Sequence, residues 1–242
     1  MSRPRFYLDQ KIALGAQFLL PLGPARHAAR VLRLSTGDTL QLFNGRGGVY
    51  AARIEHIRKD EVEVRVTDFE DTECESPLQV LLAQGISSGE RMDYTLQKAV
   101  ELGTTAIQPI AAKRSVVKLT GERVDKRVAH WQGVVQSACE QSGRNRVPSV
   151  AQPLSLANWL ALRPNGRVLF LSPQASTKLA DLPEPQGLQI LIAGPEGGFD
   201  VDEIAALVSA DALGVRLGPR VLRTETAALA ALAAMQMVWG DF

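Results

Sequence analysis

Three short apolar segments in the last third of the chain constrain its fold more than any other feature. They run from Val168 to Leu171, from Gln189 to Ala193 and from Gly214 to Leu217. Apolar runs of this kind are typical of parallel strands that are covered on both faces. The pattern therefore predicts an α/β domain built around a parallel sheet.

Two glycine-containing loops follow the second and third of these segments. The first is Gly194–Phe199, and the second begins the stretch Leu217–Ala227, which leads into an alanine-rich helix. Ligands in open α/β sheets bind at the carboxyl ends of strands, so both are candidate ligand-binding loops. Either loop alone also fits an ordinary strand-to-helix turn. Neither matches the standard phosphate-binding patterns, which disfavours a nucleoside triphosphatase or a dinucleotide dehydrogenase.

The second loop also carries charged side chains. Arg220, Arg223 and Glu225 cluster directly before the last helix. Two cations and one carboxylate are able to hold an anionic substrate or to stabilise charge that develops during a reaction. A salt bridge at the helix start is the alternative. Thr224 is expected to cap this helix, Glu225–Trp239, which is apolar nearly all round and so suits a core or a subunit interface.

The middle of the chain alternates strands and helices, as an α/β domain requires. Strands are predicted at Leu78–Ala83 and Ala106–Ile110, a loop at Gly85–Glu90, and helices at Met92–Leu102 and Arg123–Ser142. Asp200 and Glu203 have capping-box spacing at the start of a further helix, which extends through Ser209.

The first seventy residues form a separate, β-rich pattern. Strands are predicted at Thr39–Phe43, Val49–Ile57 and Val62–Val66, and a helix that Pro24 opens extends through Leu34. Together they predict a small barrel that carries one helix. The segment Glu70–Pro77 is acidic, poorly periodic and closed by proline, so it is the expected linker.

Basic residues gather locally although the net charge is only +1. Residues 1–33 carry six basic and one acidic residue, and residues 76–150 carry ten and six. Arg26, Arg30 and Arg33 fall at i, i+4 and i+7 and so share one face of a helix, while Arg144 and Arg146 lie on a loop after Gly143. Both features fit contacts with RNA; a solvated surface stripe and a simple helix end are the alternatives.

Several classes of protein lose support from the composition. Cys74 and Cys139 are far apart and the three histidines are scattered, so unpaired thiols are expected and a metal site has little support. The N-terminus lacks a signal-type apolar core, and no uninterrupted apolar segment is long enough to span a bilayer. A cytoplasmic protein is the expectation.

Three motifs together resemble one known family. They are Gly194–Gly198, the stretch Leu217–Ala227 and the segment Cys139–Pro148. They look like the RsmE family, the bacterial 16S ribosomal RNA uracil-N3 methyltransferases of the SPOUT superfamily. The resemblance extends to the N-terminal half through His27–Arg33 and Gln97–Gly103, so it covers essentially the whole chain.

The resemblance implies a particular fold and cofactor. A PUA-like RNA-binding β-barrel domain would occupy residues 1–72, and a SPOUT methyltransferase domain with a C-terminal trefoil knot would occupy residues 73–242. S-adenosylmethionine would lie in the knot, with its adenine held by backbone groups and with Gly197 and Gly198 leaving room. The implied cofactor-binding residues are Leu171, Gly194, Glu196, Gly197, Gly198, Leu217, Gly218, Val221, Leu222 and Thr226.

The implied reaction moves a methyl group to N3 of a uridine in the decoding region of the small subunit, without a metal. N3 of uracil is protonated and a poor nucleophile, so a base must remove the proton or cations must stabilise the anion. Arg220 and Arg223 are the candidates for stabilising the anion, and Glu225 for orienting one of them or acting as base. The enzyme would act as a homodimer. Candidate RNA contacts are Arg3, Arg5, Arg26, Arg30, Arg33, Arg144 and Arg146.

Three other functions stay open at this point. Another SPOUT methyltransferase, acting on a ribose 2′-hydroxyl or a different base, keeps the fold and changes the target. A PUA-like RNA-binding factor whose α/β domain has lost its chemistry would not bind S-adenosylmethionine. A generic Rossmann enzyme has the least support, because the glycine fingerprint is missing.

Overall fold

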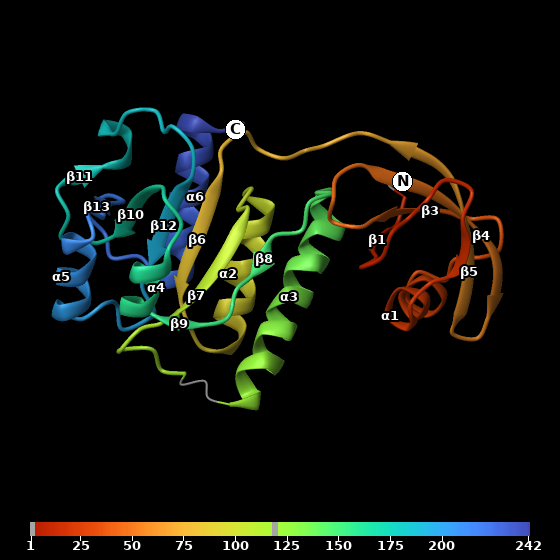
Figure 1. Ribbon diagram of the computed structural model, residues 1–242, viewed down its shortest axis with the longest axis horizontal. Helices are drawn as coiled ribbons and strands as arrows, with labels where there is room; N and C mark the ends of the chain where they lie inside the picture. The colour runs from red at the N-terminus through yellow and green to blue at the C-terminus, as the bar shows by residue number, and fades with distance from the viewer. Residues whose placement is uncertain (1–2, 118–120) are drawn as a thin grey trace. The chain divides into compact units, whose positions relative to one another are not determined.

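The computed structural model describes residues 3–117 and 121–242, and its contacts divide the chain into two compact units (Figure 1). The N-terminal unit consists of Met1–Glu75 and Cys139–Val147, and the C-terminal unit of Ser76–Ala138 and Pro148–Phe242. The chain therefore returns once to the N-terminal unit, at the end of a helix. None of the helices in the described ranges has the length and apolar character that crossing a bilayer requires.

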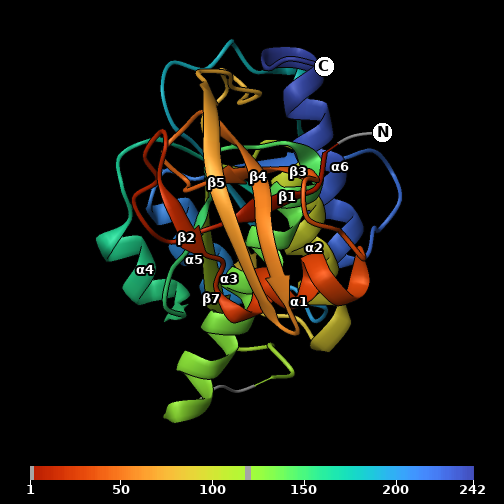
Figure 2. The ribbon, with the colours of Figure 1, turned by 90° about the vertical axis from the view of Figure 1, so that its right-hand side faces the viewer.

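The N-terminal unit is built on a five-stranded sheet in the order β1-β3-β4-β5-β2. β1 and β3 are parallel, and the other pairs are antiparallel. β4 and β5 form the long hairpin seen in Figure 2. The strands are β1 (Arg5–Tyr7), β2 (Gln17–Leu19), β3 (Thr39–Phe43), β4 (Val49–Arg58) and β5 (Glu61–Glu70). The three predicted strands are confirmed, whereas β1 and β2 are too short to show a period.

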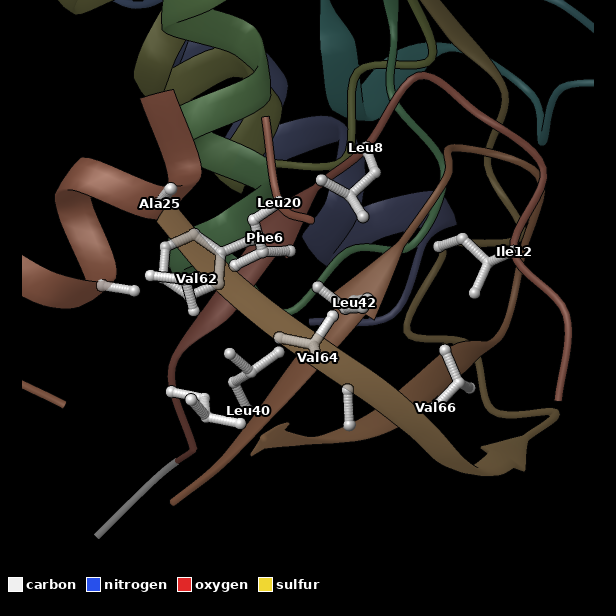
Figure 3. Close-up of a cluster of buried hydrophobic side chains, with 13 residues drawn as sticks. Phe6, Leu8, Ile12, Leu20, Ala25, Leu40, Leu42, Val62, Val64 and Val66 are labelled. Carbon is white, nitrogen blue, oxygen red and sulfur yellow. The ribbon is translucent and has the colours of Figure 1, made fainter. Parts of the chain in front are cut away.

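Alternate residues of these strands fill the core of the N-terminal unit (Figure 3). Val62, Val64 and Val66 of β5 are buried, and the residues between them are charged or polar. A strand with one buried face requires this alternation. The same core contains Phe6, Leu8, Ile12, Leu20, Ala25, Leu40 and Leu42.

The helical segment of this unit differs from its prediction at both ends. α1 (Leu22–Arg26) begins before Pro24 and continues as one π-helical turn, η1 (His27–Val31), which ends before Leu34. Pro24 is tolerated because the first four N–H groups of a helix have no intrahelical acceptor. Arg33 follows the end of the helix with a φ of 54°, so it does not continue the row of Arg26 and Arg30.

The C-terminal unit is built on an eight-stranded sheet in the order β11-β13-β10-β12-β6-β7-β8, with β9 also paired to β7. All of these pairs are parallel, which confirms the predicted sheet type. The strands are β6 (Val80–Gly85), β7 (Ala106–Ala111), β8 (Ser149–Val150), β9 (Leu154–Ser155), β10 (Arg167–Leu171), β11 (Thr177–Lys178), β12 (Gln189–Ala193) and β13 (Leu213–Arg216).

Helices cover both faces of this sheet (Figure 1). Leu169 and Leu191 belong to a core cluster with residues of α2 and α6, while Phe170 and Ile192, one position along, pack with residues of α4 and α5. Two buried faces explain why these strands are apolar throughout. The helices are α2 (Gly89–Glu101), α3 (Glu122–Ser142), α4 (Leu156–Leu162), α5 (Val201–Ser209) and α6 (Thr224–Trp239), with a 3-10 turn η2 (Leu179–Asp181).

The boundaries of one strand and one helix differ from the predicted ones, because polar residues lie inside these elements. β6 lies two residues later than predicted and includes Gln84, which is fully buried. The predicted loop Gly85–Glu90 is shorter, because α2 begins at Gly89 and not at Met92. A buried glutamine is hidden from any argument that reads a strand from its apolar residues.

The two predicted helix caps have different outcomes. Asp200 and Glu203 form the predicted capping box of α5, each side chain accepting from the backbone N–H of the other residue. Thr224 does not cap α6: Arg223 occupies the N-cap position, and the Thr224 hydroxyl donates to the carbonyl oxygen of Gly194. A tertiary contact thus takes the hydroxyl that local reasoning assigns to the helix end.

Candidate functional site

A cavity of about 460 Å³ opens in the C-terminal unit at the carboxyl ends of three neighbouring strands. Its walls come from the chain that follows β10, β12 and β13, which are adjacent in the sheet. The wall residues lie mainly in segments 170–174, 193–199 and 215–225. This is where open α/β sheets bind ligands, so the cavity is the candidate site.

Most residues predicted to bind the cofactor line this cavity. Nine of the ten do so, namely Leu171, Gly194, Glu196, Gly197, Gly198, Leu217, Gly218, Val221 and Leu222. The tenth, Thr226, is exposed on the first turn of α6 and is not among the wall residues. The two glycine loops that the sequence places far apart therefore form one site.

The glycines of the 194–198 loop serve the packing of the loop itself. A side chain at Gly197 would bring a Cβ to 2.9 Å from Cβ of Arg114 and to 3.1 Å from its carbonyl oxygen. Gly198 has a φ of 66°, which L side chains rarely adopt, and its Cβ position is open. A side chain at Gly197 would therefore clash with Arg114.

The three candidate catalytic residues all line the cavity. Arg220 and Arg223 are exposed, and within residues 3–117 and 121–242 neither forms an ion pair. Glu225 is half-buried, and its Oε2 atom is buried without a hydrogen-bond partner among the described residues. The alternative interpretation, a salt bridge at the helix start, is not found among the described residues, and these charges are available to a ligand.

The cavity is also lined by three arginines that the motifs do not identify, namely Arg91, Arg114 and Arg216. Arg91 lies 3.2 Å from Oε1 of Glu196, and Arg114 donates to the carbonyl oxygen of Gly197 at 3.3 Å. Arg91 and Arg114 belong to the connections after β6 and β7. The rule that ligands meet the carboxyl ends of strands, applied to every strand, could have found both.

Glu196 attaches the first glycine loop to the start of α2. Its Oε1 accepts hydrogen bonds from the backbone N–H and the hydroxyl of Ser88, at 2.9 and 3.0 Å. Burial acts to raise the pKa of this carboxyl, but the hydrogen bonds from Ser88 and Arg91 outweigh it, so the pKa lies below its ordinary value. Glu196 therefore stays ionised and holds the loop in place.

The predicted RNA-contacting residues of the first helix are only partly available. Arg26 and Arg30 both pair with Asp60, although their side chains remain 56% and 65% exposed. These hydrogen bonds lower the pKa of Asp60 against the opposing effect of desolvation. Arg3 and Arg33 are exposed.

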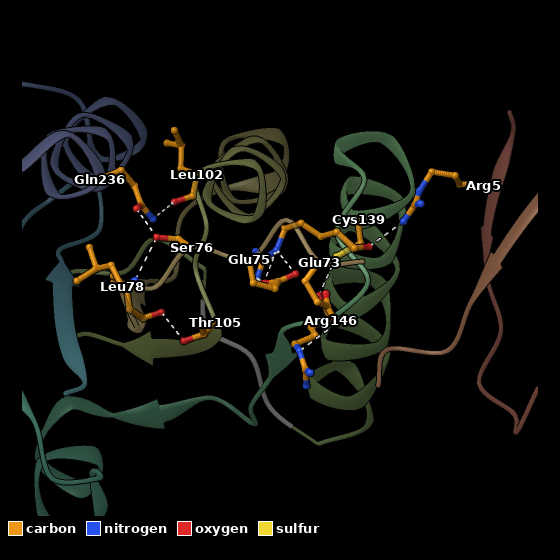
Figure 4. A network of polar contacts seen from close by, with 12 residues as sticks. Arg5, Glu73, Glu75, Ser76, Leu78, Leu102, Thr105, Cys139, Arg146 and Gln236 are labelled. Carbon is orange, nitrogen blue, oxygen red and sulfur yellow. Dashed lines mark hydrogen bonds and ion pairs between the residues drawn. The ribbon is translucent and has the colours of Figure 1, made fainter. Parts of the chain in front are cut away.

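The loop after α3 has a largely structural role. The Arg144 side chain is 5% exposed and pairs with Glu75 of the predicted linker. Arg5 donates to the carbonyl oxygens of Gly143 and Arg144 at 3.0 and 3.1 Å and lies over the Phe43 ring. Only Arg146 keeps an exposed side chain, 3.4 Å from Glu73 (Figure 4). Burial therefore argues against RNA contacts by Arg5 and Arg144.

Comparisons with known proteins agree with this fold and site. A family model described as an RNA methyltransferase domain matches residues 74–236, and one described as an RNA methyltransferase PUA domain matches residues 25–67. A ribosomal RNA small subunit methyltransferase E from Buchnera aphidicola is 32% identical over 98% of this chain and 97% of its own length.

Two solved structures are similar over their full lengths. Ribosomal RNA small subunit methyltransferase E from Neisseria gonorrhoeae, bound to S-adenosylmethionine, is 44% identical with a TM-score of 0.93, and each chain is covered completely. A putative methyltransferase from Legionella pneumophila, in complex with the same cofactor, is 38% identical with a TM-score of 0.97, again with complete coverage.

The fold and the matches define the class of this protein as an RNA methyltransferase with an N-terminal PUA domain. Within that class, the chain belongs to the ribosomal RNA small subunit methyltransferase E family. The resemblance predicted from the motifs is thus confirmed.

Proposed function

We propose that this chain transfers a methyl group from S-adenosylmethionine to N3 of one uridine in the decoding region of 16S ribosomal RNA. The observation that carries the proposal is that one cavity brings the backbone of two glycine loops together with Arg220 and Arg223. A cavity lined by backbone beside unpaired cations suits a nucleoside cofactor next to a base that becomes anionic.

The cavity fits the nucleoside part of this cofactor. Leu171, Leu217 and Leu222 give it apolar walls. Among the residues that the structure describes, the backbone groups of residues 218–222 form no hydrogen bond with another backbone group. Unpaired N–H and C=O groups at an apolar wall are available to the polar edge of an adenine. S-adenosylmethionine, when bound, supplies an electrophilic methyl group.

Arg220 and Arg223 stabilise the uracil anion in this proposal. Their positive guanidinium groups favour the form of the base that has lost its N3 proton. Glu225 has a buried Oε2 without a partner and either orients one arginine or accepts that proton. The chain's own residues thereby turn a poor nucleophile into a good one.

The N-terminal unit supplies RNA contacts. We assign them to Arg26, Arg30 and Arg146, whose side chains are more than half exposed, together with the exposed Arg3 and Arg33. Contacts with phosphates release counterions, so RNA affinity should fall as salt is added. Binding that is independent of salt would contradict this assignment.

Association into a homodimer through α6 is part of the proposal. Met237 and Val238 near the end of this apolar helix are 67% and 49% exposed. Burying them against a second copy would remove apolar surface from water. Sedimentation at micromolar concentration should give a dimer, and a monomer would contradict it.

We also propose that the reaction takes place in the cytoplasm, because its substrate is ribosomal.

The trefoil knot also belongs to the proposal, together with a domain division at residues 72 and 73 in which segment 139–147 of the methyltransferase part packs into the N-terminal unit. The chain leaves β13 near one edge of the sheet and continues into α6, which packs against α2 and β12 further along. A knotted C-terminal chain requires such a connection and, in addition, the passage of the chain through a loop.

A methyl-transfer assay with labelled S-adenosylmethionine tests the function. It compares naked 16S ribosomal RNA with small subunits that lack the modification, and we expect transfer to one of them. No transfer to either, by a chain that binds the cofactor in calorimetry, would contradict the proposed substrate. A chain that binds RNA but not the cofactor would instead be a binding factor.

A further inference from the structure

Three separate segments of the C-terminal unit meet at the hydroxyl of Thr224. The side-chain amide of Gln84, on β6, donates to Oγ1 of Thr224 at 3.0 Å and to the carbonyl oxygen of Gly85 at 3.0 Å. Oγ1 of Thr224 in turn donates to the carbonyl oxygen of Gly194. A single chain of hydrogen bonds therefore joins β6, the first glycine loop and the start of α6.

This chain of hydrogen bonds is shielded from water and closely packed. Gln84 is 0% exposed and Thr224 is 8% exposed. A Cβ at Gly85 would clash with the backbone nitrogen of Pro195, so β6 and the glycine loop are in direct contact. Buried hydrogen bonds are strong, and a buried group that loses its partner costs free energy that water cannot restore.

The position of Thr224 in the chain gives the contact a functional meaning. Its two neighbours, Arg223 and Glu225, line the cavity beside the predicted substrate, while Gly194 lines it on the predicted cofactor side. The hydroxyl is thus a direct link between the residues that face the uracil and the loop that holds the cofactor. Small displacements between reacting groups reduce rates strongly.

We propose that Gln84 and Thr224 are positioning residues, which fix the Arg223–Glu225 turn against the cofactor loop for methyl transfer. The inference rests on the proposed function, since it takes the two sides of the cavity as cofactor and substrate sides. Neither residue touches the reacting atoms in this account. Their effect is exerted through Gly194, Arg223 and Glu225.

Single substitutions separate a positioning role from a purely stabilising one. Thr224→Ser keeps the hydroxyl, and Thr224→Val keeps the shape but loses it. Thr105→Val is the matched control, because Thr105 (Figure 4) also donates a side-chain hydrogen bond to a backbone carbonyl, that of Val80 at 3.0 Å, and does not line the cavity. Each variant is assayed for kcat, for KM and Kd of S-adenosylmethionine, and for thermal unfolding.

We expect Thr224→Val to lower kcat/KM by about tenfold or more, measured well below its unfolding temperature. Thr224→Ser should stay within about threefold of wild type, and Thr105→Val should lower the unfolding temperature without changing kcat or KM. Gln84→Met should lower kcat/KM about as much as Thr224→Val does. The double variant should lose less than the product of the two single losses, because both substitutions break the same chain of hydrogen bonds.

The proposal is overturned if Thr224→Val unfolds at a lower temperature yet keeps the kcat, KM and cofactor Kd of wild type. Loss of activity in Thr224→Ser equal to that in Thr224→Val would also overturn it. Failure of the proposed function looks different: wild type itself would then show no methyl transfer or no cofactor binding. If wild type methylated another RNA position, the kcat, KM and cofactor Kd of the variants could still be compared with those of wild type.

Discussion

Arginine residues of this chain fall into two groups according to what surrounds them. Arg144 is almost fully buried and paired with Glu75, so its charge is compensated within the N-terminal unit. Arg220 and Arg223 are exposed at a cavity and form no ion pair with a described residue. A compensated charge holds the fold together, whereas an uncompensated one can act on a ligand.

Arg223→Ala should slow methyl transfer while leaving cofactor binding in place. Loss of one group that stabilises a developing anion costs about 10²–10³ in rate. Single-turnover methylation and calorimetry with S-adenosylmethionine measure the two properties separately. Arg123→Ala, which removes an exposed arginine at the start of α3 outside the cavity, is the control. An unchanged rate for Arg223→Ala would remove it from the catalytic residues.

Glu196→Gln should lose stability in a pH-dependent way. The pKa of Glu196 is lower in the folded chain than its ordinary value of 4.5, so the carboxylate contributes stability above that value and loses the contribution as pH falls through the folded pKa. The unfolding temperatures of wild type and variant should therefore differ most near neutral pH and converge in acid. A constant difference across the titration would contradict the assignment.

Sequence reasoning identified the charged loop residues but not their states of pairing. A glycine, charged residues and a helix start follow one another within a few residues, and this pattern identified Arg220, Arg223 and Glu225. Arg91 and Arg114 reach the same cavity from other strands, and Arg144 is buried by segments about seventy residues away. The surroundings of these arginines depend on how distant segments fold together, which a short motif does not reveal.

At the scale of elements, α5 shows how a helix end can be fixed by several segments. Glu203 accepts from the backbone N–H of Asp200 at 3.0 Å, as a capping box does, and its other oxygen accepts from the backbone N–H of Lys113 at 2.9 Å. Lys113 belongs to the connection after β7, and Arg114 contacts the glycine loop. The cap of α5 therefore also holds the wall of the cavity.

Glu203→Ala should destabilise the C-terminal unit by about 1–3 kcal/mol, because two backbone N–H groups lose their acceptor. Urea denaturation measures this loss. Asp202→Asn is the control on the same turn, since the Asp202 side chain is 82% exposed and pairs only with Lys113. Equal effects of the two substitutions would show that the buried contacts of Glu203 are unimportant.

Element predictions succeeded where local chemistry decides and failed where tertiary contacts do. The capping box of α5 and the end of α3 before Gly143 were predictable from a few residues. The Thr224 cap was wrong because a tertiary acceptor, Gly194, takes the hydroxyl. The extension of β6 through Gln84 was missed because the burial of a polar amide, which donates to the distant Thr224, is not visible in the local pattern.

At the scale of the whole molecule, the N-terminal unit is assembled from distant parts of the sequence. Residues 139–147 belong to it together with residues 1–75, although the predicted division assigns them to the second domain. Arg5 of β1 bonds Asn145 at 2.8 Å, and Glu75 and Glu73 of the linker pair with Arg144 and Arg146. The linker is thus held by ion pairs that its acidic composition alone does not reveal.

Arg144→Ala should destabilise the N-terminal unit by about 3–5 kcal/mol, because Glu75 would be left as a poorly solvated, unpaired charge. Arg146→Ala is the matched control, since its pair with Glu73 is exposed and should be worth about 0–1 kcal/mol. Urea unfolding followed by circular dichroism measures both. Similar small losses in the two variants would show that burial does not strengthen the Arg144 pair.

The central claim is that this chain methylates N3 of a uridine in small-subunit ribosomal RNA. The most direct measurement is mass spectrometry of nucleosides from unmodified small subunits after incubation with the chain and S-adenosylmethionine. We expect 3-methyluridine with wild type, and much less of it with Arg223→Ala at equal cofactor binding. A 2′-O-methylated nucleoside, another methylated base or no new methylated nucleoside would contradict it.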